Sequence, residues 1–241
     1  MSHRVVIRFN GICNAHKEDR PAWVAAIWRL FALSGEFEGV TAFHDSKALK
    51  GFVWNVSEST PNQFSLEFVS IREDLVRALS DGARKSMKAG EALSLSEDVI
   101  LEVMDVIPVE DYRIADGQLR LSAVTEIIVN RHVRCGHRKR RFYPVCPFED
   151  QPSYLGRLKQ NLIAKVRAFK GRTPTNEEFG IRIISSGLER SVPYKTVALR
   201  GRACSLQITG AKDILETALY AGVGKMNALG YGMMSPMRKE R

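Results

Sequence analysis

The residues best suited to acid–base chemistry lie in one polar stretch, Phe43-His44-Asp45-Ser46-Lys47, with Lys50 shortly after it. A histidine can accept or release a proton near neutral pH, and a lysine supplies positive charge to a developing anion. His44 falls in a predicted connection between a helix and a strand. The pattern alone leaves two interpretations open, a proton-transfer site and a surface histidine without a role.

A second stretch near the end of the chain combines glycines with one positive charge. Within eleven residues it contains Gly222, Gly224, Lys225, Gly230 and Gly232. A main chain without side chains would let the backbone of a ligand come close, and the lysine would supply charge. The first glycine follows a predicted helix over residues 212–221, where a positive φ often ends a helix. The alternative is a tight helix-to-strand connection that binds nothing.

The positive charge of the chain is concentrated in its second half. The formal net charge is +9, but residues 1–120 hold 14 Lys/Arg and 18 Asp/Glu, a net of −4. Residues 121–241 hold 22 Lys/Arg and 9 Asp/Glu, a net of +13. This distribution favours a polyanion, above all nucleic acid, on the second half. A solvated basic surface would give the same counts.

The densest basic run is expected to form a loop followed by the aromatic residues Phe142 and Tyr143. Its cationic and histidine side chains are Arg131, Arg134, His137, Arg138, Lys139, Arg140 and Arg141. A second basic group consists of Arg190, Lys195, Arg200 and Arg202. Basic side chains beside aromatic rings can bind phosphates and stack an unpaired base. The alternative is a disordered loop that contacts nothing.

The same run offers four residues of metal-ligating type: His132, Cys135, His137 and Cys146. Their spacing is not that of a common zinc finger, and the surrounding cations oppose a metal ion. We therefore expect no metal and no other cofactor. Four cysteines in 241 residues do not make a disulfide framework, which favours reduced thiols in the cytoplasm. No apolar run approaches the ~20 residues of a membrane span, so no membrane partner is expected.

Hydrophobic periodicity predicts the same order of elements, βαββαβ, in each half of the chain. In the first domain, residues 1–111, the elements are expected at 4–12, 21–34, 52–56, 64–68, 73–87 and 98–106. A linker over residues 112–117 follows. In the second domain, residues 118–241, we expect a strand at 119–129, a helix at 153–169, two strands within 195–208 that meet near Gly201, a helix at 212–221 and a strand at 231–235. The predicted fold class is α+β, with two tandem ferredoxin-like domains.

The two halves and the glycine-rich stretch together resemble a known superfamily. A helix followed by Gly-Val-Gly-Lys, five residues and Gly-Tyr-Gly-Met is similar to the hallmark loop of the RAMP superfamily. The segment from Leu199 to Gly210, read as a hairpin, matches the usual context of that loop. More narrowly, His44 and the chain length resemble the CRISPR-associated endoribonuclease that cuts precursor CRISPR RNA within its repeats.

The resemblance implies a metal-independent cleavage in which the ribose 2′-OH attacks the phosphate, leaving a 2′,3′-cyclic phosphate and a 5′-OH. It implies catalytic roles for His44 and Lys50, and repeat RNA, folded as a hairpin, as the partner, with CRISPR effector subunits as further partners. The family often has a tyrosine in the preceding helix, and the corresponding position here is Phe31, which has no hydroxyl. The candidate supporting groups are Arg29, Ser34, Ser46 and Lys47.

Two other functions stay open. The absent phenol would suit a RAMP subunit that holds CRISPR RNA in an effector complex without cutting it. A general RNA-binding protein of the RRM type is less well supported, because neither half has a clear aromatic RNP-type strand.

Overall fold

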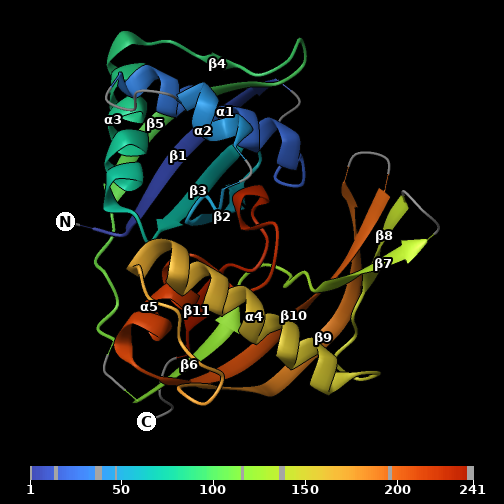
Figure 1. Cartoon of the computed structure of the whole chain (residues 1–241). Coiled ribbons are helices and arrows are strands. Elements are labelled where there is room, and N and C mark those ends of the chain that lie inside the picture. The colour runs from blue at the N-terminus through green and yellow to red at the C-terminus, as the bar shows by residue number, and fades with distance from the viewer. Residues whose placement is uncertain are drawn as a thin grey trace. The chain divides into compact units, whose positions relative to one another are not determined.

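The computed structural model describes residues 2–13, 16–35, 40–46, 48–114, 117–135, 139–194 and 197–237. The chain forms two compact units (Figure 1). Unit 1 contains Met1–Tyr112 together with Ala228–Gly230, and unit 2 contains Arg113–Asn227 together with Tyr231–Arg241. The ranges predicted from the sequence, 1–111 and 118–241, assign Ala228–Gly230 to the second domain, whereas the contacts assign this segment to unit 1.

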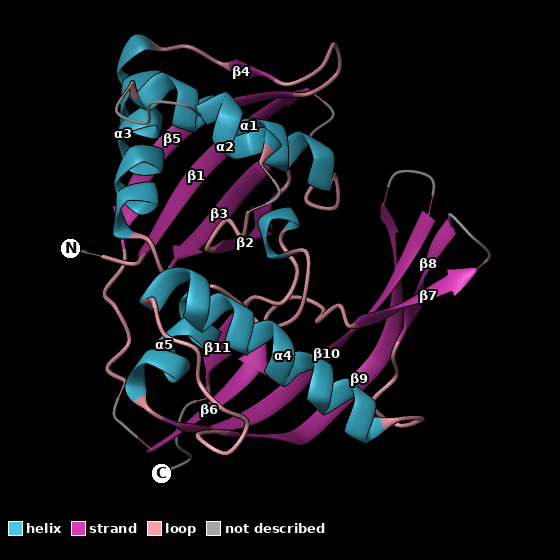
Figure 2. Cartoon of the chain, viewed as in Figure 1, coloured by secondary structure: helices cyan, strands magenta, loops and turns pink. Residues whose placement is uncertain are grey.

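Unit 1 is a ferredoxin-like sheet with two long helices on one face (Figure 2). The elements are β1 (Arg4–Cys13), α1 (Arg20–Ser34), α2 (Val40–Asp45), β2 (Phe52–Thr60), β3 (Gln63–Ser70), α3 (Glu73–Ala89), β4 (Leu93–Ser94) and β5 (Ile100–Pro108). The sheet order is β2-β3-β1-β5-β4, with every pair antiparallel. This is the predicted βαββαβ order with a short edge strand, β4, and a short helix, α2, added.

The ends of α1 and its packing follow from local sequence. Asp19 accepts a hydrogen bond from the backbone of Ala22 and so caps the helix, and Gly35 ends it at φ 67°. In α3, Gly82 lies against the backbone of Leu30, where the Cβ of any other residue would overlap the carbonyl group. The close approach of α1 and α3 therefore depends on a glycine, and it lets both helices cover one apolar core.

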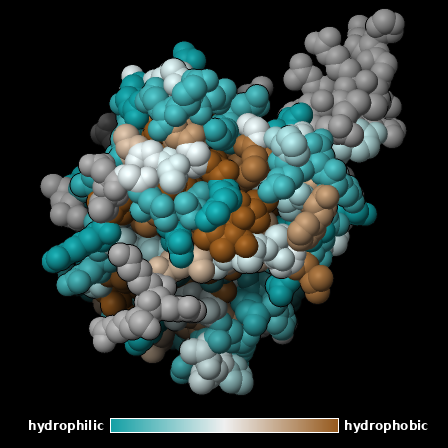
Figure 3. Space-filling model, turned by 90° about the horizontal axis from the view of Figure 1, so that it is seen from below, coloured by the Kyte–Doolittle hydropathy of each residue, from teal (hydrophilic) through white to brown (hydrophobic). Residues whose placement is uncertain are grey.

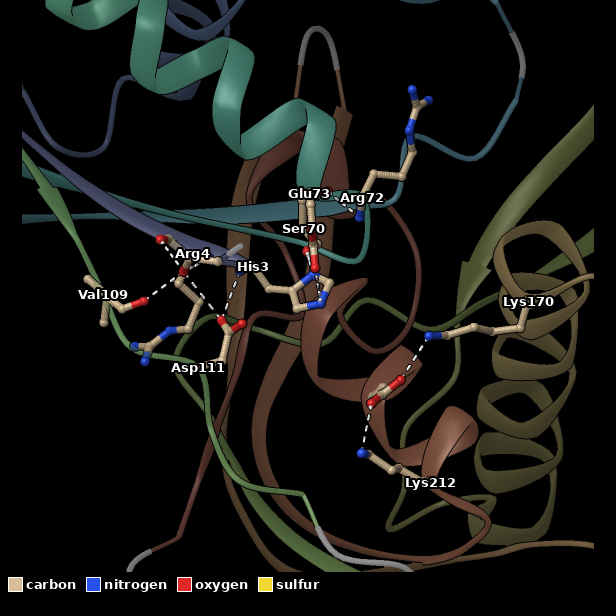
Figure 4. Close-up of polar contacts among 11 residues, drawn as sticks. His3, Arg4, Ser70, Arg72, Glu73, Val109, Asp111, Lys170 and Lys212 are labelled. Atoms are coloured by element: carbon tan, nitrogen blue, oxygen red, sulfur yellow. Dashed lines mark hydrogen bonds and ion pairs between the residues drawn. The ribbon is translucent and has the colours of Figure 1, made fainter.

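The N-terminus of unit 1 is tied to the segment that leaves β5. Asp111 accepts hydrogen bonds from the backbone N–H of His3, at 2.8 Å, and from the hydroxyl of Ser2 (Figure 4). The His3 ring lies between Ser70 and Glu73, with Nδ1 2.9 Å from the Ser70 carbonyl oxygen and Nε2 3.5 Å from the Glu73 carboxylate. These contacts fix the end of β5 beside the start of β1.

Unit 2 repeats the fold with a hairpin inserted after its first strand. The elements are β6 (Gly117–Ala123), β7 (Asn130–Cys135), β8 (Lys139–Pro144), α4 (Gln151–Lys170), β9 (Gly180–Tyr194), β10 (Val197–Gly210), α5 (Lys212–Tyr220), the 3-10 turn η1 (Asn227–Leu229) and β11 (Met234–Pro236). The sheet order is β11-β6-β10-β9, and β7 and β8 form a separate two-stranded sheet. The prediction of tandem ferredoxin-like domains is confirmed.

The two helices of unit 2 are joined at the surface by one carboxylate. Glu216 of α5 lies 2.8 Å from the amine of Lys170 in α4 and 3.9 Å from that of Lys212 (Figure 4). Exposed ion pairs of this kind contribute little each. They nevertheless show that α4 and α5 lie side by side.

Two strand predictions in unit 2 are wrong. The pair of strands expected within residues 195–208 is a single strand, β10, which passes through Gly201 without a turn. Its neighbours in the sheet are β9 and β6. The expected hairpin from Leu199 to Gly210 lies within that same strand. β9 is an edge strand with many polar residues, so its alternation was too weak to detect. The strand expected at 119–129 ends at Ala123.

The expected basic loop is the hairpin β7–β8. Its register pairs Arg131 with Tyr143 and Arg134 with Arg140. A run of cations disguises the period-2 pattern of a strand, which explains the error. Among the described residues, no helix has the length and apolar character needed to span a membrane.

Candidate functional site

His44 lies in the last turn of α2, not in the irregular connection that the sequence suggested. Its ring meets Trp28 of α1 edge to face, with ring centroids 4.6 Å apart, and the side chain of His44 stays exposed. Trp28 also contacts the rings of Phe43 and Phe52. An aromatic cluster therefore holds α2 against α1 and sets the direction of the histidine. Trp28 was missed because it falls outside the apolar stripe of α1.

Asp45 determines which nitrogen of His44 carries a hydrogen. The Asp45 carboxylate oxygen lies 2.8 Å from Nδ1 of His44. An ionised carboxylate can only accept, so Nδ1 must donate in this contact. In the neutral ring the other nitrogen, Nε2, is then the acceptor, and it is the atom that can exchange a proton with a ligand.

Lys50 forms hydrogen bonds with the C-terminal end of α2. Its ammonium donates to the carbonyl oxygen of Phe43 and, at 2.9 Å each, to the carbonyl and hydroxyl oxygens of Ser46. Burial lowers the pKa of Lys50, and the charge of Asp45 opposes that shift. A cation at a helix C-terminus also interacts favourably with the helix dipole. These contacts position α2, and with it His44.

The other groups predicted around His44 are not all directed toward it. Ser46 donates to the Phe43 carbonyl oxygen as well as accepting from Lys50. Arg29 donates to the carbonyl oxygen of Ser94 in β4, and Ser34 donates to the Phe31 carbonyl oxygen. Lys47 lies outside the described residues. Phe31 is 0% exposed and belongs to the core, in agreement with its place on the apolar stripe.

The space beside the glycines near the end of the chain is occupied by other atoms of the protein. In unit 2, a Cβ at Gly222 would come within 2.9 Å of the Gly232 carbonyl oxygen, and one at Gly224 would meet Ile127 and Ile128 at 2.8 Å. A Cβ at Gly232 would overlap the Val223 carbonyl. All three have positive φ. At these three positions the Cα atoms therefore face the protein's own atoms, and contact between RNA and the stretch stays a prediction.

A buried lysine donates hydrogen bonds to the glycine-rich stretch. Lys165 of α4 is 2% exposed, and its amine donates to the Gly222 carbonyl at 2.6 Å, the Gly224 carbonyl at 3.1 Å and the Asn227 side-chain oxygen at 2.7 Å. Burial lowers the pKa of Lys165 to about 7. Its spacing, three residues after Leu162 and seven after Leu158, was the available signal for the inner face.

The tip of the stretch, Ala228–Gly230, belongs to unit 1. Trp54 of β2 donates its indole N–H to the Ala228 carbonyl oxygen at 3.0 Å. Arg20, the first residue of α1, donates to the carbonyl oxygens of Leu229 and Gly230 at 3.1 and 2.9 Å. A Cβ at Gly230 would meet the Trp54 ring at 3.0 Å. Gly230 is thus required for a close contact inside unit 1.

The predicted cations of unit 2 fall in two places. Arg131, Arg134, Lys139, Arg140 and Arg141 lie on the hairpin β7–β8, whose backbone alone is described there, while His137, Arg138 and Lys195 lie outside the described residues. The remaining arginines have acidic or backbone partners. Arg190 pairs with Glu126 at 3.3 Å, Arg200 pairs with Glu189 at 3.3 Å, and Arg202 donates to the Gly187 carbonyl oxygen.

Arg202 also lies beside an exposed ring. Its guanidinium carbon is 5.0 Å from the centroid of Phe148, which is 70% exposed. Figure 3 shows hydrophobic residues, drawn in brown, among hydrophilic ones on the face seen from below. An exposed aromatic ring next to an arginine provides a surface on which an unpaired base can stack.

The four residues of metal-ligating type are only partly described in the structure. His137 lies outside the described residues, as do the side chains of His132 and Cys135, and Cys146 is a free cysteine. Among the side chains that are described, no group of three or more His, Cys, Asp or Glu is arranged to hold a metal ion.

Comparison with known proteins identifies the family. The family model "CRISPR associated protein Cas6, C-terminal" matches residues 108–236. A Cas6-related protein from Pyrococcus furiosus has 17% identity and a TM-score of 0.78, with 100% of both chains covered. A RAMP protein described as binding different RNA substrates has 17% identity and a TM-score of 0.77, covering 98% of this chain and 99% of its own.

A Cas6 product complex has 14% identity and a TM-score of 0.70, and the match covers 98% of this chain and 100% of that one. At these identities the structures establish the shared fold alone. No curated protein sequence matches the chain. Because the family model covers more than half of the residues, the chain belongs to the CRISPR-associated Cas6 family.

Proposed function

We propose that this chain is an endoribonuclease that cuts precursor CRISPR RNA within its repeats, without a metal ion, and retains the mature RNA. The observation that carries the proposal is the pairing of His44 with Asp45 in a member of the Cas6 family. Support for an RNA substrate comes from the solved structures of similar fold, one described as a product complex and one as binding different RNA substrates.

The proposed reaction is attack by the ribose 2′-oxygen on the adjacent phosphorus. The new P–O2′ bond forms as the P–O5′ bond breaks, so the 2′-OH loses a proton and the 5′-oxygen gains one. The products are a 2′,3′-cyclic phosphate and a 5′-OH. Nε2 of His44 transfers one of these two protons, while Asp45 keeps the ring in the required tautomer. Lys50 contributes to the reaction by positioning α2, because its ammonium already donates hydrogen bonds to Phe43 and Ser46.

The hairpin β7–β8 is the proposed main contact with RNA. Its five described cationic positions lie on twelve residues of backbone, and the register sets Arg134 opposite Arg140. Like charges in facing positions are unfavourable in an isolated hairpin, and a polyanion would relieve that repulsion. Arg190, Arg200 and Arg202 form a second candidate contact. Arg190 and Arg200 are exposed, and the ion pairs of exposed arginines are weak enough to be exchanged for phosphate.

A second function is favoured by one observation. The residue that matches the family tyrosine, Phe31, is buried in the core of unit 1 and offers no hydroxyl. A chain that binds CRISPR RNA without cutting it would need no such group. Binding without cleavage by the wild-type protein would support this alternative over the endoribonuclease.

The test is incubation with repeat RNA in EDTA, followed by analysis of the ends. We expect a single cut in the repeat, at the 3′ base of its hairpin where it has one, and a cyclic phosphate on the upstream product. His44→Ala should reduce the rate by about 10²–10⁴-fold, the range for general acid–base groups, with RNA affinity unchanged. His16→Ala, which removes another exposed histidine of unit 1, is the matched control.

A substrate with 2′-deoxyribose at the cleaved nucleotide should bind normally and stay intact, because it lacks the nucleophile. An unchanged cleavage rate for His44→Ala, with RNA binding intact, would contradict the catalytic role of His44. Cleavage that disappears in EDTA and returns with a divalent cation would overturn the metal-independent mechanism.

A further inference from the structure

Unit 2 contains a small polar cavity between α4, the residues that lead into β7, and the glycine-rich stretch. Its volume is about 180 Å³, and its polar lining comes from Asn130, Arg157, Gln160, Asn161 and Lys225. One water occupies ~30 Å³ in the liquid, so the cavity has room for a group of several heavy atoms. Among the described residues that line it, two are cations and none is an acid.

The two cations are close enough to repel one another. The pKa of Lys225 is lowered by burial and, to a smaller extent, by the charge of Arg157. The Lys225 amine donates to the side-chain oxygen of Asn130 at 2.9 Å, which fixes it at the cavity wall. Two positive charges that face a cavity without a carboxylate are stabilised when an anion enters.

Two buried polar atoms of the lining residues have no hydrogen-bond partner in the described part of the chain: Nε of Arg157 and Oδ1 of Asn161. Such atoms are expensive to leave unpaired and call for an explanation in a native structure. A half-turn of the Asn161 amide exchanges its oxygen and nitrogen, so it can offer either an acceptor or a donor to a ligand. Because of this amide, the site can hydrogen-bond polar groups of a ligand in addition to binding an anion.

We propose that this cavity binds one unpaired nucleotide of the RNA, with a backbone phosphate at Arg157 and Lys225 and the base at Asn161. The proposal rests on the RNA-processing function proposed above and adds a specific subsite to it. Asn130 is the first residue of β7, so the cavity is continuous with the basic hairpin. An RNA strand that follows the hairpin would thus bring one nucleotide to the cavity.

The first experiment replaces single phosphates of the repeat RNA with neutral methylphosphonates, one linkage at a time. With wild-type protein, we expect one or two linkages to lose at least about tenfold in affinity. With Arg157→Gln or Lys225→Gln, the same substitution should have no further effect, because the phosphate has already lost its partner. Arg167→Gln is the matched control, since it removes an exposed cation from the same helix outside the cavity.

The second experiment titrates the protein with the four nucleoside 5′-monophosphates and with inorganic phosphate, followed by NMR. We expect binding of the nucleotides that is lost in Arg157→Gln, and a preference among bases that is lost in Asn161→Leu. Equal binding of phosphate and nucleotides would limit the site to an anion and overturn the base contact. Thermal unfolding of each variant shows whether it is folded.

The two proposals fail in different ways. If the protein cuts repeat RNA and no linkage depends on Arg157 or Lys225, the nucleotide subsite is wrong and the endoribonuclease stands. If nucleotides bind through Arg157 while repeat RNA is not cut, the subsite stands and the endoribonuclease is wrong.

Discussion

The amine of Lys165 lies 2.6 Å from the carbonyl oxygen of Gly222, inside the glycine-rich stretch. With the Gly224 carbonyl and the Asn227 side chain, it has three oxygen acceptors, which matches the three N–H bonds of an ammonium ion. Burial opposes the charge and lowers the pKa of Lys165 to about 7. The stretch is thus held by a cation that can lose its proton close to neutral pH.

The stability of the protein should therefore rise with pH above about 7 because of Lys165. Between a folded-state pKa of about 7 and the ordinary value of 10.5, the unfolded chain carries one more proton than the folded chain. Raising the pH then favours the folded state, by up to about 1.4 kcal/mol per pH unit. The measurement is denaturant unfolding of wild type and Lys165→Met between pH 6 and pH 10.

In the Lys165→Met variant this rise should be absent, while the other pH dependence of the protein is retained. Parallel stability curves for the two proteins across the whole range would show that Lys165 keeps its proton in the folded state throughout.

Gly232 should tolerate alanine far less well than Gly171, although both have nearly the same backbone conformation. Their φ angles are 71° and 72°. A Cβ at Gly232 would overlap the Val223 carbonyl, whereas a Cβ at Gly171 would meet nothing within 4 Å. Gly171→Ala should cost about 1–2 kcal/mol from the left-handed backbone alone. Gly232→Ala should cost about 2–3 kcal/mol more from overlap, as measured by chemical denaturation. Equal losses would mean that the Val223 carbonyl moves aside.

Asp45→Asn should slow RNA cleavage by about tenfold without changing RNA affinity. The amide oxygen can still accept from Nδ1 of His44, but the negative charge that stabilises the protonated ring is gone, and the amide can turn its nitrogen toward the ring. Asp45→Glu tests whether a carboxylate restores the rate. Single-turnover cleavage at saturating protein separates the chemical step from binding. Retention of the full rate in Asp45→Asn would leave His44 without a partner in the reaction.

Lys50 is expected to act through His44, and a double-mutant cycle tests this. If Lys50 only holds α2, Lys50→Ala should slow cleavage in wild type but have almost no effect in a His44→Ala background. If its ammonium contacts the phosphate directly, the two losses should add. Single-turnover rates of the four proteins give the answer, with RNA affinity measured in parallel.

Replacement of the five cations of β7 and β8 by glutamine should flatten the salt dependence of RNA binding. These residues are Arg131, Arg134, Lys139, Arg140 and Arg141. The slope of log K against log salt should fall by about 0.7–0.9 for each lost phosphate contact. Replacement of Arg84 and Lys88 on α3 is the control for loss of charge elsewhere. A slope that stays at its wild-type value would exclude the hairpin as the contact.

The order of elements could be predicted because it depends on local patterns. The cap at Asp19, the glycine that ends α1, and the apolar spacing of α3 are all short-range signals that can be read from neighbouring residues. The burial of Phe31 follows from its place on the apolar stripe of α1. The proposal of an RNA substrate followed from charge and from the glycine-rich stretch.

The errors come from residues whose environment is set by distant parts of the chain. Lys165 looks like a surface lysine until three acceptors from the glycine-rich stretch surround it. The strands β7 and β9 carry so many charged and polar residues that only their partners reveal them as strands. Asn161 and Arg157 have no special sequence context at all. Their significance depends on the cavity that they line.

The assignment of Ala228–Gly230 to unit 1 has a consequence for synthesis on the ribosome. Trp54 finds its acceptor, Ala228, 174 residues further along the chain. The hydrogen bonds that the Trp54 indole and Arg20 donate to this segment therefore form only after almost the whole polypeptide has been translated. A chain stopped after Tyr112 would lack this segment, so the first unit to be started is completed only when translation has passed Gly230.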